Sequence, residues 1–357
     1  MTNTSREAVE EKLKGIIDPH TDKDLVSAKA VKDITVDGDK VKISIVLGYP
    51  AKSWEAELMA MVGAAVEGAE VSVESNPQSH EVQEGVKPLQ GVKNIIAVAS
   101  GKGGVGKSTL SVNLALALSA EGARAGILDA DIYGPSQPRM LGISGKPQSK
   151  DGKSLEPMNS YHLQAMSIGF LVDEESPMIW RGPMVTQALE QLLKDTRWDD
   201  LDYLVVDMPP GTGDTQLTLA QKVPVSGSVI VTTPQDIALL DARKAYKMFE
   251  KVEIPVLGVV ENMSTYHCPK CGHEEHIFGF GGGANMAEQY GADFLGGVPL
   301  DRAIRENADG GRPSVVADPD GEIARAYKAI ARRTAARLAL RKKDFSAKFP
   351  NIVIQQN

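Results

Sequence analysis

A short glycine-rich stretch carries the residue types that bind polyphosphate. Residues 101–109 read GKGGVGKST and contain the spacing G-x-x-x-x-G-K-S, from Gly101 through Lys107 to Ser108. Glycines adopt backbone angles closed to other residues, so successive N–H groups can point inward at a phosphate. In this motif the lysine reaches the β- and γ-phosphates, and the hydroxyl that follows it binds Mg2+. The sequence therefore predicts a nucleotide-binding loop with Lys107 on the phosphates and Ser108 on the metal ion.

The residues around this stretch are those that such a loop needs. Residues 95–100 are apolar and β-branched, which predicts a buried strand, and residues 110–120 have helical composition. The loop then lies at a helix N-terminus, where backbone N–H groups and the helix dipole favour anions. The order strand, loop, helix favours nucleotide binding over the alternative, a glycine-rich turn without a ligand.

Three carboxylates follow two further predicted strands. Residues 123–128 precede Asp129 and Asp131, and residues 204–206 precede Asp207. Open α/β sheets bind ligands at the carboxyl ends of their strands, where a carboxylate can hold Mg2+ beside a phosphate loop. We therefore expect Asp207, with help from Asp129, in the Mg2+ shell. The alternative for Asp129 and Asp131 is to cap the turn that follows the strand.

Cys268 and Cys271, in C-x-x-C spacing, are the only two cysteines, and so small a number excludes a disulfide framework. Soft thiolates two residues apart can hold a metal ion from one side. One chain cannot supply four cysteines to a zinc ion or a cubane cluster, but two chains across a two-fold axis can. There are two alternatives to a site shared by two chains. One is a zinc ion bound within one chain by the two cysteines with His273 and His276, and the other is a reversible disulfide. Chemistry alone does not decide among these three possibilities.

The positions of these motifs define the organisation of the chain. From Lys93 onward strands and helices alternate nearly to the end, which predicts an α/β fold with a doubly wound, mostly parallel sheet. A small α/β module precedes it. The expected boundaries are residues 1–76 for the module, 77–92 for a linker, 93–340 for the P-loop domain with a CxxC insertion, and 341–357 for a tail.

The small module contains a recognisable series of local signals. Thr4 with Glu7 predicts a capping box for a helix that ends near Gly15. Strands at 31–36 and 41–47 are joined by the turn sequence DGD, and a helix at 53–66 and a strand at 71–74 follow. Further helices are expected at 180–198 and 241–251 and strands at 229–232 and 256–260, all within the larger domain.

Composition restricts the possible partners and location. The 357 residues carry a formal net charge of −8, and 42% are hydrophobic, as in an ordinary globular protein. The pI near 5.4 argues against nucleic acid as a partner, because binders of polyanions usually have a basic excess. No run of eighteen apolar residues occurs and the N-terminus is polar, so we expect no membrane span, no secretory signal and a cytoplasmic location.

The extra lysine in the loop, Lys102, makes GKGGVGKST resemble the variant loop of the MinD/ParA class of P-loop ATPases. The resemblance implies a face-to-face dimer in which Lys102 reaches the nucleotide of the other subunit, as an arginine finger does. It also implies that Asp131 orients the attacking water and that residues 207–214 form a nucleotide-sensing switch, with Asp214 near the partner. Asn262 would read the adenine edge, since an amide both donates and accepts.

The resemblance thus gives a full set of expected site residues. The catalytic residues are Lys102, Lys107 and Asp131, and the magnesium residues are Ser108, Asp207 and Asp129. ATP would contact Gly101, Lys102, Gly103, Gly104, Val105, Gly106, Lys107, Ser108, Thr109 and Asn262.

Several motifs together resemble the Mrp/ApbC family of iron-sulfur cluster carrier ATPases, from about Arg6 to about Ala339. They are the loop, ILDADIYGPS, MPPGTGD and ENMS followed by CPKC. This resemblance implies a homodimer that binds a [4Fe-4S] cluster between subunits through Cys268 and Cys271. It would pass the cluster to apo-proteins, coupled to ATP binding and slow hydrolysis.

The N-terminal module resembles the small domain of iron-sulfur assembly factors, with one departure. Many relatives place a cysteine just after the proline equivalent to Pro50, where this chain has Ala51, Lys52 and Ser53. A cluster-handling role through a thiol of this module is therefore excluded, and a docking role is expected.

The C-terminal helix offers a competing interpretation. Residues 323–338 combine an apolar stripe with a basic face, and MinD-type relatives use such a helix to bind membranes. A spatial-organising ATPase with a structural zinc site is therefore the alternative function. The stripe is thin and alanine-rich, so packing on the domain with the basic residues solvated is favoured.

Overall fold

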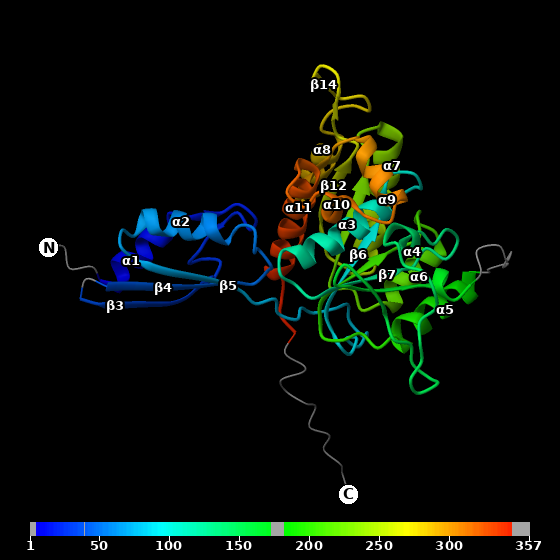
Figure 1. Ribbon diagram of the computed structural model, residues 1–357, viewed down its shortest axis with the longest axis horizontal. Helices are drawn as coiled ribbons and strands as arrows, with labels where there is room; N and C mark the ends of the chain where they lie inside the picture. The colour runs from blue at the N-terminus through cyan, green and yellow to red at the C-terminus, as the bar shows by residue number, and fades with distance from the viewer. Residues whose placement is uncertain (1–4, 39, 173–181, 345–357) are drawn as a thin grey trace, which may run out of the picture.

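The computed structural model describes residues 5–38, 40–172 and 182–344, which form a small N-terminal domain beside a larger α/β domain (Figure 1). In these residues, none of the helices combines the length and the apolar character that crossing a membrane requires.

The larger domain is built on an eight-stranded sheet with the order β15-β12-β11-β6-β10-β7-β9-β8. All neighbours are parallel except β8 and β9. The bounds are β6 (Val92–Ala99), β7 (Ala125–Asp129), β8 (Met158–Ser160), β9 (Leu163–Ser167), β10 (Leu201–Asp207), β11 (Gly227–Thr232), β12 (Val256–Asn262) and β15 (Phe294–Val298). The predicted doubly wound, mostly parallel sheet is confirmed. Because β6, β10 and β7 are neighbours, the glycine loop and the strand-end carboxylates share one edge.

Both faces of the sheet are covered, as successive residues of β6 show. Ile96 and Val98 belong to the core under α3 (Lys107–Ala120) and α11 (Glu322–Ala339). Ile95 and Ala97 point the other way, into a second core under α5, α6 and α7. These helices span Gly182–Asp195, Asp214–Lys222 and Asp236–Lys251. The helix expected at 180–198 is therefore α5, shorter at its C-terminal end, and residues 180 and 181 lie outside the described residues.

Short elements complete the domain. They are α4 (Gln137–Met140), a 3-10 turn (Ile168–Phe170), the hairpin β13 (Tyr266–His267) and β14 (Glu274–Glu275), α8 (Gly282–Tyr290), α9 (Arg302–Asp309) and α10 (Ser314–Ala317).

The N-terminal domain follows the order of elements that its sequence predicts. The elements are α1 (Arg6–Leu13), β1 (Ile17–Asp18), β2 (Lys23–Asp24), β3 (Val31–Asp37), β4 (Lys40–Leu47), α2 (Glu55–Ala65) and β5 (Glu70–Ser75). Strands β3 and β4 form the expected antiparallel hairpin, and β5 adds in parallel to β4. The cap of α1 is Ser5, whose Oγ accepts from the Ala8 N–H at 3.2 Å, whereas Thr4 lies outside the described residues.

Helix α11 lies between the N-terminal domain and the sheet (Figure 1). Its apolar side chains, Tyr327 and Ile330 among them, are buried in the core, as the packing interpretation predicts. The expectation of a solvated basic face is wrong for two residues. Arg332 is bonded to Glu121, and Arg337 pairs with Asp22 of the small domain. These arginines are held at the domain junction by the buried Glu121 carboxylate and by the exposed Asp22 carboxylate.

Candidate nucleotide and metal site

The glycine loop connects β6 to α3 and contains positions that only glycine fits. Gly106 has φ +83°, a left-handed conformation, and a Cβ there would overlap the Asn262 side-chain amide. Gly101 touches the backbone of Asp241 in α7, where a Cβ would have no room. The loop is therefore held between β12 and α7, with its N–H groups at the start of α3.

Lys107, Ser108 and Asp207 come together as the sequence predicts. Lys107 Nζ lies 2.5 Å from Asp207 Oδ1 and 3.1 Å from Ser108 Oγ, and both the lysine and the aspartate are buried. Ser111 Oγ donates to the same carboxylate oxygen at 2.8 Å. The Lys107 ammonium group thus lies between the Ser108 hydroxyl and the buried Asp207 carboxylate. The hydroxyl and the carboxylate are hard oxygen donors of the kind that Mg2+ prefers. The donor set fits this metal ion.

Gln137 is a residue of this site that the sequence did not indicate. Its Nε2 donates to Asp207 Oδ2 at 2.9 Å and to the Ser108 carbonyl at 3.1 Å. It therefore links the loop after β7 to the strand-end carboxylate of β10. The only signal in the sequence was an amide next to Pro138 in the segment after Asp131, which by itself points to a turn.

Asp129 anchors the loop that carries Gln137. Its Oδ2 accepts from the backbone N–H groups of Ser136 at 2.9 Å and Gln137 at 3.0 Å, and its Oδ1 accepts from Asp131. Burial and the nearby charge of Asp207 raise the pKa of Asp129 to about 7. The carboxylate caps this turn, as the alternative interpretation predicts, and its place in the Mg2+ shell stays a prediction.

Asp131 and Lys102 lie at the accessible side of the site. Asp131 is half-buried and burial raises its pKa. Lys102 is also half-buried, and no carboxylate within the described part of the chain forms an ion pair with it. The switch segment lies behind the loop, since Gly211 N–H donates to the Ser100 carbonyl at 3.0 Å, and Asp214 is exposed in the first turn of α6. The roles in water positioning, trans contact and dimerisation stay predictions.

The end of β12 joins the glycine loop to α8. Asn262 Nδ2 donates to the Val105 carbonyl at 2.8 Å, and the preceding Glu261 accepts from Gly283 N–H at 2.6 Å. Burial raises the pKa of Glu261. Asn262 therefore contacts the loop directly, while its reading of adenine stays a prediction.

The two cysteines lie side by side on the turn of the β13–β14 hairpin. Cys268 N–H donates to the His273 carbonyl and the Cys268 carbonyl accepts from Gly272 N–H, at 2.9 and 2.8 Å. The backbone N–H groups of Lys270 and Cys271 lower the pKa of the Cys268 thiol. Cys271 is exposed and Cys268 half-exposed. The pair therefore offers two accessible sulfurs, and the lowered pKa of Cys268 favours its thiolate form.

The neighbouring histidines point elsewhere. His267 Nε2 lies 3.0 Å from Glu274, and His276 Nδ1 lies 2.9 Å from the Ser264 carbonyl. Within residues 5–38, 40–172 and 182–344, no three His, Cys, Asp or Glu side chains are grouped to share a metal ion. The one-chain zinc set of Cys268, Cys271, His273 and His276 is thus not assembled.

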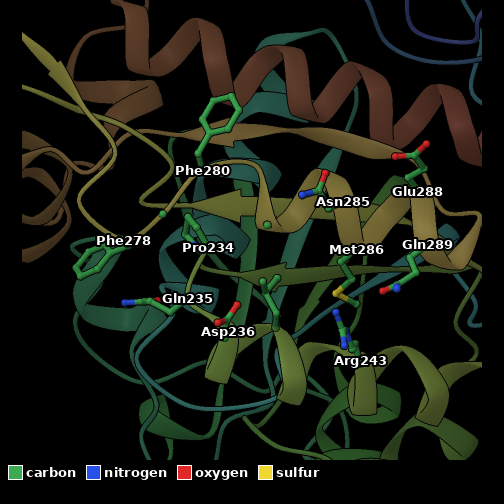
Figure 2. Close-up of a pocket in the computed structure, with 13 residues that line it drawn as sticks. Pro234, Gln235, Asp236, Arg243, Phe278, Phe280, Asn285, Met286, Glu288 and Gln289 are labelled. Atoms are coloured by element: carbon green, nitrogen blue, oxygen red, sulfur yellow. The ribbon is translucent and has the colours of Figure 1, made fainter.

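A pocket of about 870 Å³ lies beside the hairpin, between α7, α8 and the segment that follows β14. Figure 2 shows Phe278 and Phe280 on one side of it, and Arg243, Met286 and Gln289 on the other. Phe280 is 79% exposed. An exposed aromatic side chain therefore follows the cysteine hairpin in the chain.

Comparison with known proteins gives matches to both domains. A family model described as NUBPL iron-transfer P-loop NTPase matches residues 91–335, and one described as iron-sulfur cluster assembly protein matches residues 6–75. A Haemophilus influenzae protein named iron-sulfur cluster carrier protein is 48% identical over 345 residues, 95% of this chain and 93% of its own.

Solved structures agree on the fold of the larger domain. A nucleotide-binding protein of Archaeoglobus fulgidus, in complex with ADP, has a TM-score of 0.56 and 37% identity, covering 65% of this chain and 90% of its own. The cell division ATPase MinD of Pyrococcus furiosus has a TM-score of 0.52 and 21% identity, with 67% and 97% covered, and shows the fold alone.

Proposed function

The chain belongs to the NUBPL family of iron-transfer P-loop NTPases, and from this premise we propose that it is an iron-sulfur cluster carrier. Two copies would hold a [4Fe-4S] cluster between them and transfer it to apo-proteins, in a step coupled to ATP binding and slow hydrolysis. The observation that carries the proposal is the pair of accessible thiols on the β13–β14 hairpin, with no third ligand grouped beside them in the described residues.

The ATP-binding part of the proposal rests on the buried Lys107–Asp207 pair. With nucleotide bound, Lys107 would turn from Asp207 to the phosphates, and Ser108 and Asp207 would hold Mg2+. The ion would supply positive charge to the phosphates. The bond that Gln137 donates to Asp207 Oδ2 would fix the orientation of that carboxylate. Asp131 would position water, and Lys102 would add charge from the second copy.

The cluster-binding part follows from the number of ligands. A cubane cluster takes four cysteine thiolates, and each chain supplies Cys268 and Cys271. Two chains related by a two-fold axis supply four, and the exposed Phe280 beside the hairpin gives that interface apolar area. The lowered pKa of Cys268 favours the thiolate that ligates metal.

A short connection between the two sites supports the coupling. Asn262 bonds to the loop carbonyl of Val105, and Cys268 follows six residues later in the chain. Between them Met263 has φ +56°, and Ser264 is bonded to the Val298 carbonyl through its N–H and to His276 through its carbonyl. A displacement of Asn262 when nucleotide enters would therefore move the base of the hairpin. This route complements the switch at residues 207–214, which would sense the phosphate state.

Cluster transfer to apo-aconitase tests the proposal, because its activity returns only when a cluster is inserted. Wild-type protein reconstituted with iron and sulfide should restore activity, and ATP with Mg2+ should change the rate. Lys107→Ala should bind the cluster but lose the response to ATP, and Cys268→Ala should transfer nothing. Transfer by Cys268→Ala equal to wild type would contradict the proposal, as would a response to ATP retained in Lys107→Ala.

A further inference from the structure

A second cavity, of about 600 Å³, lies at the junction of the two domains. Its walls come from the segment between β1 and β3, the ends of β4 and β5, and the chain just after α11. None of the residues that line it belongs to the glycine loop or to the cysteine hairpin. It is therefore separate from the site described above, and its size is within the range of small-molecule pockets.

The cavity gathers positive charge in an acidic protein. Lys23, Lys29 and Lys32 line it from the small domain and Lys343 from the larger one. Within the described residues, no ion pair engages any of these four exposed lysines, whereas the chain as a whole carries a net charge of −8. Like charges facing one cavity repel one another unless an anion lies between them.

The two carboxylates in the lining do not neutralise this charge. Asp18 accepts hydrogen bonds at 2.8 Å from the Tyr49 hydroxyl, the Thr21 hydroxyl and the His20 N–H, so it is already committed. Glu74 is the other acidic residue of the lining. Four lysines therefore face two carboxylates, which leaves the cavity with an excess of positive charge.

A buried histidine adds an unused acceptor. His80 lines the cavity and is 3% exposed, and its Nδ1 lies 2.9 Å from Asn94 Oδ1. The Asn94 amide nitrogen donates to the Gln78 and Asp202 carbonyls, which fixes Oδ1 as an acceptor and Nδ1 of His80 as the donor. Burial lowers the pKa of His80 and the charge of Lys343 lowers it further, so the ring is neutral. Its Nε2 is an acceptor without a hydrogen-bond partner, which is rare for a buried polar atom.

We propose that this cavity binds a phosphorylated polyol, such as a sugar bisphosphate, with its phosphates on the four lysines and a hydroxyl donating to His80 Nε2. Lysines pair with phosphate as point charges, and the side chains of Thr21, Ser27 and Asn76 in the lining offer further partners for hydroxyls. Because lysines of both domains contact one ligand, binding fixes the small domain on the larger one. The inference does not depend on the cluster-carrier function.

Titration calorimetry on the full chain tests this, with the nucleotide loop first saturated with ADP and Mg2+ and with fructose 1,6-bisphosphate as the probe. The bisphosphate should bind at least about tenfold more tightly than inorganic phosphate, since it uses more of the lysines. Lys23→Glu and Lys343→Glu, one from each domain, should each weaken binding about tenfold or more. Lys12→Glu, an exposed residue of α1 outside the cavity with the same change in charge, should leave binding unchanged.

Three results would overturn the proposal. The first is no binding of the bisphosphate at millimolar concentration, and the second is equal loss in Lys12→Glu and the cavity variants. The third is binding of a glutamate-rich peptide with the same lysine dependence when the bisphosphate does not bind, which would make the cavity a site for acidic protein segments. Circular dichroism of each variant shows that the fold is retained in every comparison.

Discussion

Arg332→Ala is expected to loosen the small domain from the larger one. Arg332 lies on α11 with its side chain 15% exposed, and one guanidinium nitrogen is 2.7 Å from Glu121 Oε1 and 2.6 Å from Ser53 Oγ. Its Nε lies 3.0 Å from His20 Nε2. Glu121 is the C-cap of α3, the helix that begins at the glycine loop. The network therefore joins the small domain to the far end of the nucleotide-binding helix.

The magnitude follows from what the substitution leaves behind. Removing one partner of a buried ion pair costs about 3–5 kcal/mol, because the other charge stays buried and unpaired. The Glu121 side chain is fully buried, yet it keeps two donors from Ser53, the N–H at 2.9 Å and the hydroxyl at 2.5 Å. Each such bond to a charged group retains about 1.5 kcal/mol or more. Two such bonds together retain about 3 kcal/mol, so we expect Arg332→Ala to lower the free energy of unfolding by about 1–2 kcal/mol.

Chemical denaturation followed by tryptophan fluorescence measures this loss, with Trp54 reporting from the small domain, where its ring lies 4.8 Å from that of His20. In a Glu121→Gln background the same substitution should cost less than about 1 kcal/mol, because no charge is left unpaired. Arg333→Ala is the matched control on the same helix, since Arg333 bonds to the Leu295 carbonyl of the larger domain. The reasoning would be refuted if Arg332→Ala and Arg333→Ala lowered the free energy of unfolding by amounts within about 0.5 kcal/mol of each other.

Three further predictions concern the nucleotide site. Gly106→Ala should weaken ATP binding by at least about tenfold in calorimetry, because φ at this position is +83° and the new Cβ overlaps Asn262. An unchanged affinity for ATP would contradict this, because it would show that the loop accepts a side chain at position 106. Asn262→Ala should reduce the preference for ATP over GTP by about tenfold, while Asn285→Ala, in the pocket beside α8, should not. For Asp129, with a pKa raised from 3.8 to about 7, the folded chain holds a proton that the unfolded chain releases between these pH values. Stability of the nucleotide-free protein should therefore fall as pH rises across this window, and Asp129→Asn should flatten the profile; an unchanged slope would contradict the assignment.

Local patterns were sufficient to predict much of the molecule. The glycine loop and the strands that end at Asp129 and Asp207 follow from motif spacing and from apolar runs that are continuous in sequence. The hairpin of β3 and β4 follows from a turn of two or three residues. In each case the residues that determine the structure are neighbours in the chain.

What could not be predicted depends on residues far apart in sequence. Glu121 and Arg332 are separated by 211 positions, so no spacing rule links them, and the basic side of α11 resembled an ordinary solvated face. The bonds from the N–H groups of Ser136 and Gln137 to Asp129 could not be predicted either, because a carboxylate after a strand can ligate a metal or cap a turn. Gln137 itself carries no motif, and only the adjacency of β7 and β10 brings it to Asp207.

The central claim is that two chains share one iron-sulfur cluster through Cys268 and Cys271. Anaerobic reconstitution with iron and sulfide, followed by metal and sulfide analysis and mass in solution, tests it on wild type and Cys268→Ala. The account predicts a wild-type dimer with about four irons and about four sulfides and an oxygen-sensitive visible absorption. In Cys268→Ala the bound iron and sulfide and the visible absorption should be lost. Stoichiometric zinc without a chromophore, or a full cluster on a monomer, would contradict it.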